Sequence, residues 1–452
     1  MKTTRILALP LFFLGSIALT ACGGSGSDTD TNTGGTGGTG GNTNTVTLTA
    51  SVVQNTVCNT QVPASSAELV VYDNNWAIKS RHPADANGTI TATIPQASAV
   101  NISLIGTTGS GTSRQINVDS FSQHPVGDLG VYTVPGTTTQ GCECETTDVS
   151  VYSEMGTLYY DTQISGHNIN TSFDSISTNF YGTDYFGVEI CRVAGGQWPT
   201  LYGATHSMED FHAAGYLSDY DPTAPLTIVL EQTPSTYSAN FDPASSYASV
   251  THNFDDAYFS GRAGYALSDI AIYENLPGLT VISLRAYNSS TYYVDNLSVN
   301  AGRMQRYSMA PPYSSTVNVD LPDENGLGIF MQGIMNWLQS ENTRYDFSNV
   351  NGFETFSISL NATLTDGSQY YQTFLGPKRG DIPEEVLPSD YGVDDLLDEE
   401  NFSIYASMIR YGNQQTYQQY LQSKTNASRM TLSERLLSDR SQFHQIFVDI
   451  RQ

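Results

Sequence analysis

The sequence is poor in positive charge. Its 452 residues include 19 Lys and Arg against 45 Asp and Glu, which gives a formal net charge of −26. A surface this negative repels nucleic acid and anionic lipid headgroups. The composition therefore excludes nucleic acid as a partner, and it leaves cations, basic proteins and neutral glycans as chemically suitable ones.

The sequence also lacks the short motifs that mark common catalytic sites. It contains no Gly-x-Ser-x-Gly elbow, no His-Glu-x-x-His pair, no Ser-x-x-Lys with its partner motifs and no Walker loop. A triad assembled in space stays open, because triads do not depend on sequence proximity. We predict no catalytic residue and no cofactor, and we favour a protein that is not an enzyme.

Clusters with the spacing of metal ligands are scarce too. His206 and His212 are the closest His pair, but a spacing of six is too wide for zinc ligands on one helix. We interpret them as part of a solvated, weakly helical loop. The stretch from Asp381 to Glu400 carries nine acidic residues and no basic one, yet it lacks the glycine-containing calcium loop. We interpret it as a solvated acidic loop and predict no metal ligand.

Long apolar runs are absent except near the N-terminus, where the chain has the layout of an export signal. Lys2 and Arg5 precede an apolar run, residues 6–18, that is too short to span a bilayer comfortably. Residues 19–22, Leu-Thr-Ala-Cys, closely resemble the lipobox of bacterial lipoproteins. The resemblance implies removal of residues 1–21 as a signal peptide.

The same resemblance implies acylation of Cys22 on its sulfur and on its new amino group. Gly23 follows, where inner-membrane lipoproteins typically carry Asp, so the resemblance implies lipid anchoring to the outer membrane. Whether the body then faces the periplasm or the cell surface stays open. Residues 22–45 are the predicted tether, because beyond Cys22 they contain only Gly, Ser, Thr, Asn and two Asp. Such a segment buries too little surface to order itself, and as a flexible coil it would span about 25 Å.

Cysteine is rare, with five residues in the whole chain. Apart from Cys22 these are Cys58, Cys142, Cys144 and Cys191. An even number in an exported protein predicts two disulfides, and three pairings are possible. We favour Cys58–Cys142 with Cys144–Cys191, because Cys142 and Cys144 flank a predicted domain boundary. A metal site that uses Cys142 and Cys144 is the alternative.

Helix signals are scarce, and alternating apolar residues predict a mainly β fold. In residues 46–135 about seven short alternating runs predict a small β-sandwich, and Asn87-Gly88 predicts a hairpin turn before the run at Ile90. The strand at residues 67–71 and the turn and strand at residues 85–95 resemble the carboxypeptidase-regulatory, transthyretin-like modules of exported proteins. That resemblance implies a structural spacer or binding module.

Residues 142–452 are predicted to form a larger β-rich region with a few short helices. Leu279 to Leu284 is apolar on both faces, which predicts a central strand. Helical spacing from Leu327 to Leu338 predicts a helix, and Thr431 with Glu434 predicts a capping box. A division into two domains near residues 301–325 stays open.

Residues 401–452 hold six basic and three acidic side chains. We therefore expect this tail to dock against the acidic remainder of the protein.

Adjacent tyrosines, such as Tyr292-Tyr293 and Tyr370-Tyr371, suggest sugar binding, although neighbours on a strand point to opposite faces and so offer one ring per side. Tyr159-Tyr160 is a third such pair. The prediction that follows from the whole sequence is an outer-membrane-anchored lipoprotein that acts as a non-catalytic structural or ligand-binding module. The alternatives are a protein that binds or hydrolyses polysaccharide, and a subunit of a surface assembly such as a pilus, sheath or secretion complex. Its partners would be the membrane through the lipid, and glycans or other envelope proteins.

Overall fold

The computed structural model is mainly β, with several sheets and few helices, which confirms the predicted fold class. It describes residues 44–451, apart from 155–160, 167–168, 171–172, 207–210, 243–244, 246, 255–256, 264–268, 295–296, 314–315, 340–342, 383–386, 394–396, 413 and 415. The predicted signal peptide, the predicted lipid site at Cys22 and nearly all of the tether lie outside these residues.

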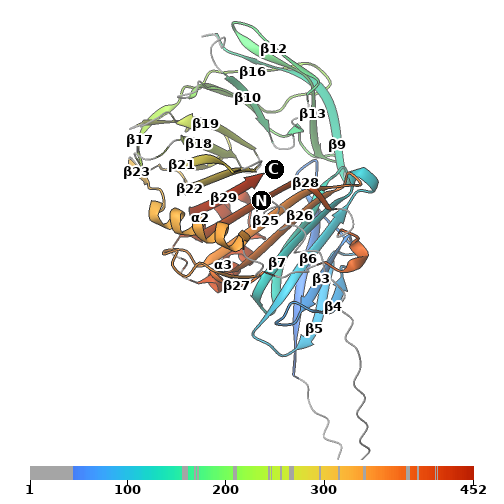
Figure 1. Cartoon of the computed structure of the whole chain (residues 1–452). Helices are drawn as coiled ribbons and strands as arrows, with labels where there is room; N and C mark the ends of the chain where they lie inside the picture. The colour runs from blue at the N-terminus through green and yellow to red at the C-terminus, as the bar shows by residue number, and fades with distance from the viewer. Residues whose placement is uncertain are drawn as a thin grey trace, which may run out of the picture.

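In the part of the chain that the structure describes, twelve strands join into one twisted sheet (Figure 1). In spatial order they are β19 (Ala257–Ala263), β18 (Tyr247–Phe254), β21 (Leu279–Val294), β22 (Leu297–Met309), β29 (Gln442–Arg451), β28 (Leu397–Tyr411), β25 (Thr355–Leu364), β26 (Gln369–Pro377), β7 (Gln115–Pro125), β6 (Ala99–Thr108), β3 (Ala67–Tyr72) and β4 (Ile78–Pro83). A parallel pairing of β7 with β26 joins the N-terminal strands to the C-terminal ones. One sheet therefore runs through both of the regions that the sequence analysis separated.

The centre of this sheet agrees with the local sequence patterns. Strand β21, which contains the run predicted as a central strand, is paired on both sides, with β18 and β22. Strand β22 is in turn paired with β29. A division near residues 301–325 would begin inside β22 and separate these paired strands.

The N-terminal sandwich packs a second sheet against the β3–β6–β7 end of the main sheet. Its strands are β1 (Thr45–Thr56), β2 (Gln61–Pro63), β5 (Thr89–Pro95) and β8 (Asp128–Thr138). Strand β5 alternates exposed Thr with buried Ile90, Ala92 and Ile94, as a half-buried strand should. Helix α3 (Tyr417–Ala427) closes the open side of the sandwich with Leu421 and two tyrosines.

The turn at Asn87-Gly88 is present, but the predicted hairpin is wrong. Gly88 has a φ of +70°, and Asp85 accepts hydrogen bonds from the backbone N–H groups of Asn87 and Thr89. The strands on the two sides of this turn belong to different sheets, because β4 pairs with β3 and β5 pairs with β1. The turn therefore carries the chain from one layer of the sandwich to the other.

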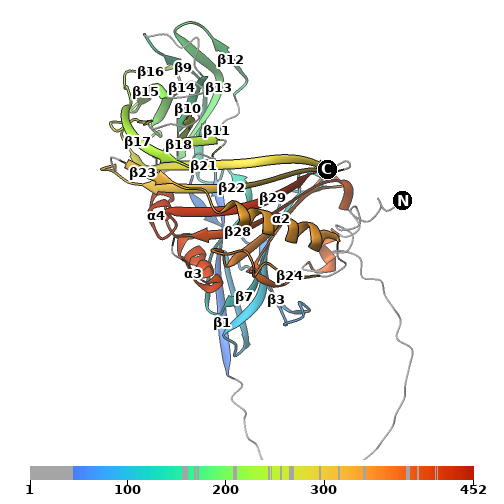
Figure 2. The same cartoon turned by 60° about the vertical axis from the view of Figure 1, so that its left-hand side comes forward.

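Residues 142–232 form a small β module at the end of the molecule opposite to β1 (Figure 2). One sheet contains β11 (Ile169–Asn170), β13 (Gly182–Val193), β9 (Cys142–Tyr152) and β16 (Leu226–Val229), with β12 (Ser175–Thr178) also paired to β13. A second contains β10 (Asp161–Gly166), β14 (Leu201–His206) and β15 (Phe211–Leu217). A core that includes Val149, Ile190 and Ile228 lies between them.

The remaining elements cover the faces of the main sheet. Strands β17 (Ser235–Phe241), β20 (Asp269–Ile272) and β23 (Thr316–Val319) share a core with β18 and β21. Helix α2 (Glu324–Gln339), which confirms the predicted helix, buries Phe330 and Ile334 against the middle of the sheet. Short strands β24 (Arg344–Asp346) and β27 (Arg379–Asp381) pair beside it. Helix α4 (Leu432–Leu437) begins with the predicted capping box of Thr431 and Glu434.

Both predicted disulfides are present, in the favoured pairing. Cys58–Cys142 links the turn after β1 to the start of β9, across a Cα–Cα distance of 5.7 Å. Cys144–Cys191 joins two residues that face each other directly across β9 and β13, with a Cα–Cα distance of 4.1 Å. Cys58–Cys142 therefore braces the joint between the sandwich and the small module, and Cys144–Cys191 braces the small module itself.

Candidate functional site

The turn between β12 and β13 exposes two aromatic side chains at the tip of the small module. The Asn179 side chain accepts hydrogen bonds from the backbone N–H groups of Tyr181 and Gly182, at 2.8 and 3.1 Å. The Asn179 backbone N–H donates to the carbonyl of Gly182 at 2.9 Å. This tight turn points its central residues outward, so that Phe180 and Tyr181 are 49% and 50% exposed.

Further aromatic rings gather around this turn. The ring of Phe180 packs edge-on against that of Tyr181 with centroids 5.0 Å apart, and the Tyr152 ring lies 6.2 Å from the Tyr181 ring. Lower on the same pair of strands, Ile176 and Phe186 are also exposed. Isolated exposed apolar side chains are common, but groups of them typically mark interaction surfaces. We call β12, β13 and the turn between them, with the exposed Ile176, Phe180, Tyr181 and Phe186 and the neighbouring Tyr152, the aromatic hairpin; the strand register places Ile176 and Phe186 on opposite faces of it.

The hairpin also has an open strand edge. All four residues of β12 are exposed, and within the described part of the chain β12 pairs with β13 alone. An edge strand offers unpaired N–H and C=O groups to any chain that can add as another strand. The aromatic hairpin therefore combines apolar rings with free backbone hydrogen-bonding groups.

The hairpin lies far from the point at which the predicted tether enters the body. The tether joins at Thr45, the first residue of β1, and β12 lies at the opposite end of the molecule in both views (Figures 1 and 2). The aromatic hairpin is thus at the end of the protein most remote from its predicted anchor.

Adjacent tyrosines on a strand should point to opposite faces, and one of the two described pairs shows this difference in exposure while the other does not. Tyr370 is buried and its neighbour Tyr371 is exposed, because they point to opposite faces of β26. Tyr292 and Tyr293 near the end of β21 are both exposed. Tyr159-Tyr160 lies outside the described residues. The exposed tyrosines of the aromatic hairpin come instead from positions that the sequence analysis did not single out.

The two histidines of the closest pair lie in strands rather than in a helical loop, and residues 207–210 between them lie outside the described part of the chain. His206 ends β14 and His212 belongs to β15, the two strands of a hairpin. The side chains of both residues lie outside the described part of the structure. The pairing of β14 with β15, which begins at Leu201 and Leu217, outweighs the local helical preference of the polar sequence around the two histidines.

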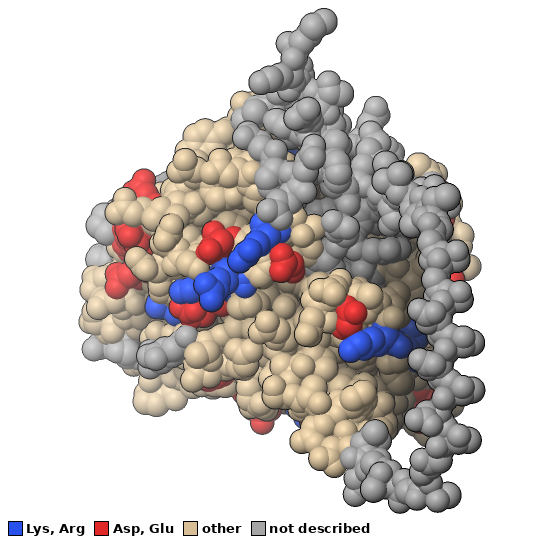
Figure 3. Space-filling model, turned by 60° about the horizontal axis from the view of Figure 1, so that its bottom comes forward, with Lys and Arg blue, Asp and Glu red and all other residues tan. Residues whose placement is uncertain are grey.

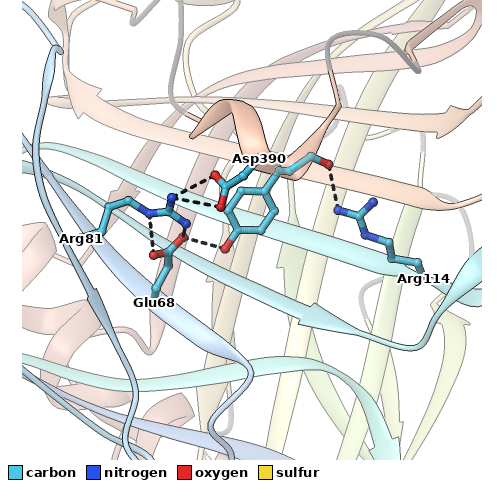
Figure 4. Close-up of polar contacts among 5 residues, drawn as sticks. Glu68, Arg81, Arg114 and Asp390 are labelled. Atoms are coloured by element: carbon cyan, nitrogen blue, oxygen red, sulfur yellow. Dashed lines mark hydrogen bonds and ion pairs between the residues drawn. The ribbon is translucent and has the colours of Figure 1, made fainter.

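The acidic stretch is only partly solvated, as an ion pair between its residue Asp390 and the N-terminal region shows. Arg81 donates two hydrogen bonds to Glu68 and two to Asp390, at 2.7 to 3.1 Å (Figure 4). The Tyr391 hydroxyl donates to Glu68 at 2.7 Å, and Arg114 donates to the Tyr391 carbonyl at 2.9 Å. This network fastens residues 389–391 to the β3–β4 edge of the main sheet. Asp394 and Asp395 lie outside the described residues.

The cysteine metal site is inconsistent with the structure. The Glu189 carboxylate and the sulfurs of Cys144 and Cys191 lie within 4.8 Å of one another, a distance at which three such groups could bind a metal ion. Both sulfurs are bonded to each other, and Cys142 is bonded to Cys58. Because metals bind the thiolate, these sulfurs are not available as ligands.

No described helix is both long and apolar enough to cross a membrane. No protein-family model and no curated protein matches the chain.

Three solved structures show a weak likeness. The shaft pilin SpaA of Lactobacillus rhamnosus GG is 11% identical, with 41% of this chain and 96% of that chain covered and a TM-score of 0.12. The major pilin subunit BcpA of Bacillus cereus is 7% identical, with coverage of 62% and 100% and a TM-score of 0.13. Two B repeat units of the collagen-binding protein of Staphylococcus aureus are 11% identical, with coverage of 74% and 85% and a TM-score of 0.12. TM-scores this low do not establish a shared fold, so function is argued from the residues of this chain.

Proposed function

We propose that this protein is a lipid-anchored, non-catalytic module of the bacterial outer membrane that presents the aromatic hairpin to another envelope protein. Cys22 carries the lipid, residues 22–45 give reach, and the braced β body holds the hairpin away from the membrane. The observation that carries the proposal is the placement of the hairpin at the end opposite to Thr45.

The chemistry of the hairpin supports a protein partner rather than a flat sugar platform. Sugar rings stack on open aromatic faces, but the Phe180 and Tyr181 rings meet at 84°. Tyr152 and Tyr181 are tilted by 34°. A partner strand could pair with β12 and bury these rings on either side, which is the mode of strand addition seen in many protein complexes.

The proposal is tested by site-specific photo-crosslinking in cells that produce the protein. A crosslinking residue at Ser177 of β12 should give one dominant product with an envelope protein. The double substitution Phe180→Ser with Tyr181→Ser should lower the yield at least fivefold, because it removes the apolar rings from the contact. The matched control is Tyr293→Ser, which removes a tyrosine that is 81% exposed at the end of β21, and it should leave the yield unchanged.

The anchor is tested separately. Cys22→Ser should move the protein from the membrane fraction to the soluble fraction, and mass spectrometry of the native protein should find acyl chains on Cys22. An unmodified Cys22, or residues 1–21 still attached, would disprove the anchor. Equal crosslinking by the hairpin variant and by the unsubstituted protein would disprove the hairpin as the contact surface.

A further inference from the structure

Two arginines face each other directly on the main sheet. Arg285 of β21 and Arg306 of β22 are cross-strand partners. Like charges in this position repel and destabilise a sheet. Arg306 is partly buried, its guanidinium lies 5.5 Å from the ring of Phe443, and its Nη2 donates to the carbonyl of Arg440 at 3.4 Å. In a protein of net charge −26, such a pair is unexpected.

Two more arginines extend the group. The Arg440 guanidinium stacks on the Tyr411 ring at 4.0 Å. The pKa of Arg306 is lowered by burial and by the charges of Arg440, Arg435 and Arg285, although Tyr411 opposes the shift. We call Arg285, Arg306, Arg435 and Arg440 the arginine group. The basic side chains on the face shown in Figure 3 lie directly beside acidic ones, which is the usual arrangement in a chain of net charge −26.

The nearby carboxylates have other partners. Asp128 is paired with Arg429 at 2.6 Å, and Glu434 accepts from the backbone N–H of Thr431 in the capping box. Asp439 accepts from Ser423 and Gln414. Among the described residues, no ion pair joins a member of the arginine group to a carboxylate. Within the described part of the chain, the charge of this group is therefore not neutralised by an ion pair.

A cavity of about 400 Å³ opens beside this group, between β7, β8 and the helices α3 and α4. Arg435, Arg440 and Lys424 line it, and the Lys424 ammonium lies 5.7 Å from the ring of Phe121, which also lines the wall. This volume suits a small molecule rather than a protein segment. Neutral polar side chains also line it, beside apolar ones such as Leu104, Leu129 and Met430; the polar ones are Asn55, Gln61, Tyr132, Thr133, Thr425 and Ser428.

Two titratable groups on β7 also face the cavity. Burial raises the pKa of Asp119, and Lys424 opposes this shift. In its neutral form this carboxyl donates a hydrogen bond to a hydroxyl group. Burial lowers the pKa of His124, whose Nδ1 donates to the carbonyl of Pro125 at 2.8 Å. Burial therefore disfavours the positively charged form of His124.

We propose that this cavity binds a small hydroxylated carboxylate, of the class of sugar acids. The ligand carboxylate would pair with Arg435, Arg440 and Lys424, since guanidinium and ammonium groups recognise carboxylates by charge-assisted hydrogen bonds. Its hydroxyls would bond to the amides, the hydroxyls and Asp119, and its apolar ring face would lie against Phe121 and Tyr132. A site that recognised only the negative charge of its ligand would need only basic side chains. The many neutral donors and acceptors are what favour a hydroxylated ligand.

Isothermal titration of the intact, detergent-solubilised protein with three probes tests this site. Glucuronate offers the carboxylate with hydroxyls, glucose offers the hydroxyls alone, and inorganic phosphate offers charge alone. We expect glucuronate to bind at least tenfold more tightly than either of the others, and to weaken at 0.5 M salt because screening acts on the ion pairs. Equal binding of phosphate would reduce the site to a general anion site and overturn the sugar assignment. Equal binding of glucose, or no heat with glucuronate at 10 mM, would overturn the proposal.

The double substitution Lys424→Gln with Arg435→Gln should weaken glucuronate binding at least tenfold. Neither side chain has an ion pair among the described residues, so the fold should survive, and the melting temperature without ligand checks this. The matched control is Arg451→Gln, which removes a positive charge about 30 Å away along β29 and should leave binding unchanged. If the double variant and the control bind glucuronate equally well, the basic lining is not the site.

Discussion

The N-terminal sandwich and the small module are built from similar strands, but they differ in where their apolar side chains lie. The buried core of the sandwich includes twenty described residues, several of them large, such as Leu48, Leu69 and Ile90. The small module has a core of ten described residues, and it leaves Phe180, Tyr181 and other large side chains in water.

This difference follows from what covers each region. Helix α3 and the C-terminal strands enclose the sandwich, so its apolar residues have a protein surface to pack against. The small module projects from the end of the molecule, and among its described residues Tyr202, Ala204 and Ala214 pack on the neighbouring core. Burial of apolar side chains therefore stabilises the sandwich, whereas the small module depends more on its disulfides. The small module also keeps exposed apolar side chains that a partner protein could contact.

The largest expected effect is loss of the bridge inside the small module. Replacing Cys144 and Cys191 by Ser should destabilise this module by about 4 kcal/mol, because the bridge closes a chain segment with a sequence separation of 47. Urea unfolding should then show an early transition in the fluorescence of Trp198, which lies under the guanidinium of Arg192 at 4.2 Å. The sandwich, followed by hydrogen exchange of β5, should keep its midpoint. A single coincident transition would show that the two regions are held together more strongly than their cores suggest.

The next effect tests whether burial holds the sandwich closed. Leu421 of α3 is 1% exposed in the sandwich core, so Leu421→Ala should cost about 3 kcal/mol of unfolding free energy. Leu437 at the end of α4 is 41% exposed, and Leu437→Ala, the matched control, should cost less than about 1 kcal/mol. Equilibrium unfolding of the two variants measures both values. Similar losses would mean that α3 does not close the sandwich by packing.

Much of the local structure could be predicted from the sequence, because its signals are local. The alternation around Ile90, the helical spacing after Leu327 and the capping box at Thr431 each act within a few residues. The partners of the strands were not predictable in this way. Strand β7 pairs with β26, from the other end of the chain, and β5 after the Asn87-Gly88 turn pairs with β1. Such pairings depend on the whole core rather than on the residues that pair.

The candidate sites were hidden for related reasons. Phe180 and Tyr181 could have been noticed as an apolar pair inside an Asn-x-x-Gly turn, where polar residues are usual. The arginine group could not have been found, because Arg285, Arg306 and Arg440 come from three separate segments that only the sheet brings together. Helix α3 has many polar residues and no clear apolar periodicity. Its capping box at Thr416 and Gln419 is the sequence feature that could have predicted where this helix begins.

A smaller effect should appear on acidification, in the core of the main sheet on which the small module packs. His252 is fully buried in β18 against Tyr273, and burial lowers its pKa to about 3. Between about pH 6.5 and pH 3 the unfolded chain binds a proton there that the folded chain does not, so stability falls as the pH falls. From pH 7 to pH 5 the loss should approach about 2 kcal/mol. His252→Asn should flatten this dependence in pH-resolved urea unfolding, while His444, whose pKa is lowered to about 4 by burial and Arg410, keeps part of it. An unchanged slope would contradict the assignment to His252.

The smallest effect distinguishes charge from burial as the force that holds the C-terminal segment to the sandwich. The sequence suggests that the basic residues 401–452 dock on acidic surface, and Arg429 does pair with Asp128 of β8 at 2.6 Å. Both side chains are about half exposed, at 43% and 53%, so water and salt screen the pair. Arg429→Gln should therefore cost at most about 1 kcal/mol at low salt, and nothing measurable at 0.5 M salt. The same segment contributes β28 and β29 to the main sheet and Leu421 to the sandwich core. A loss for Arg429→Gln as large as that for Leu421→Ala would mean that charge, rather than strand pairing and burial, fixes this segment in place.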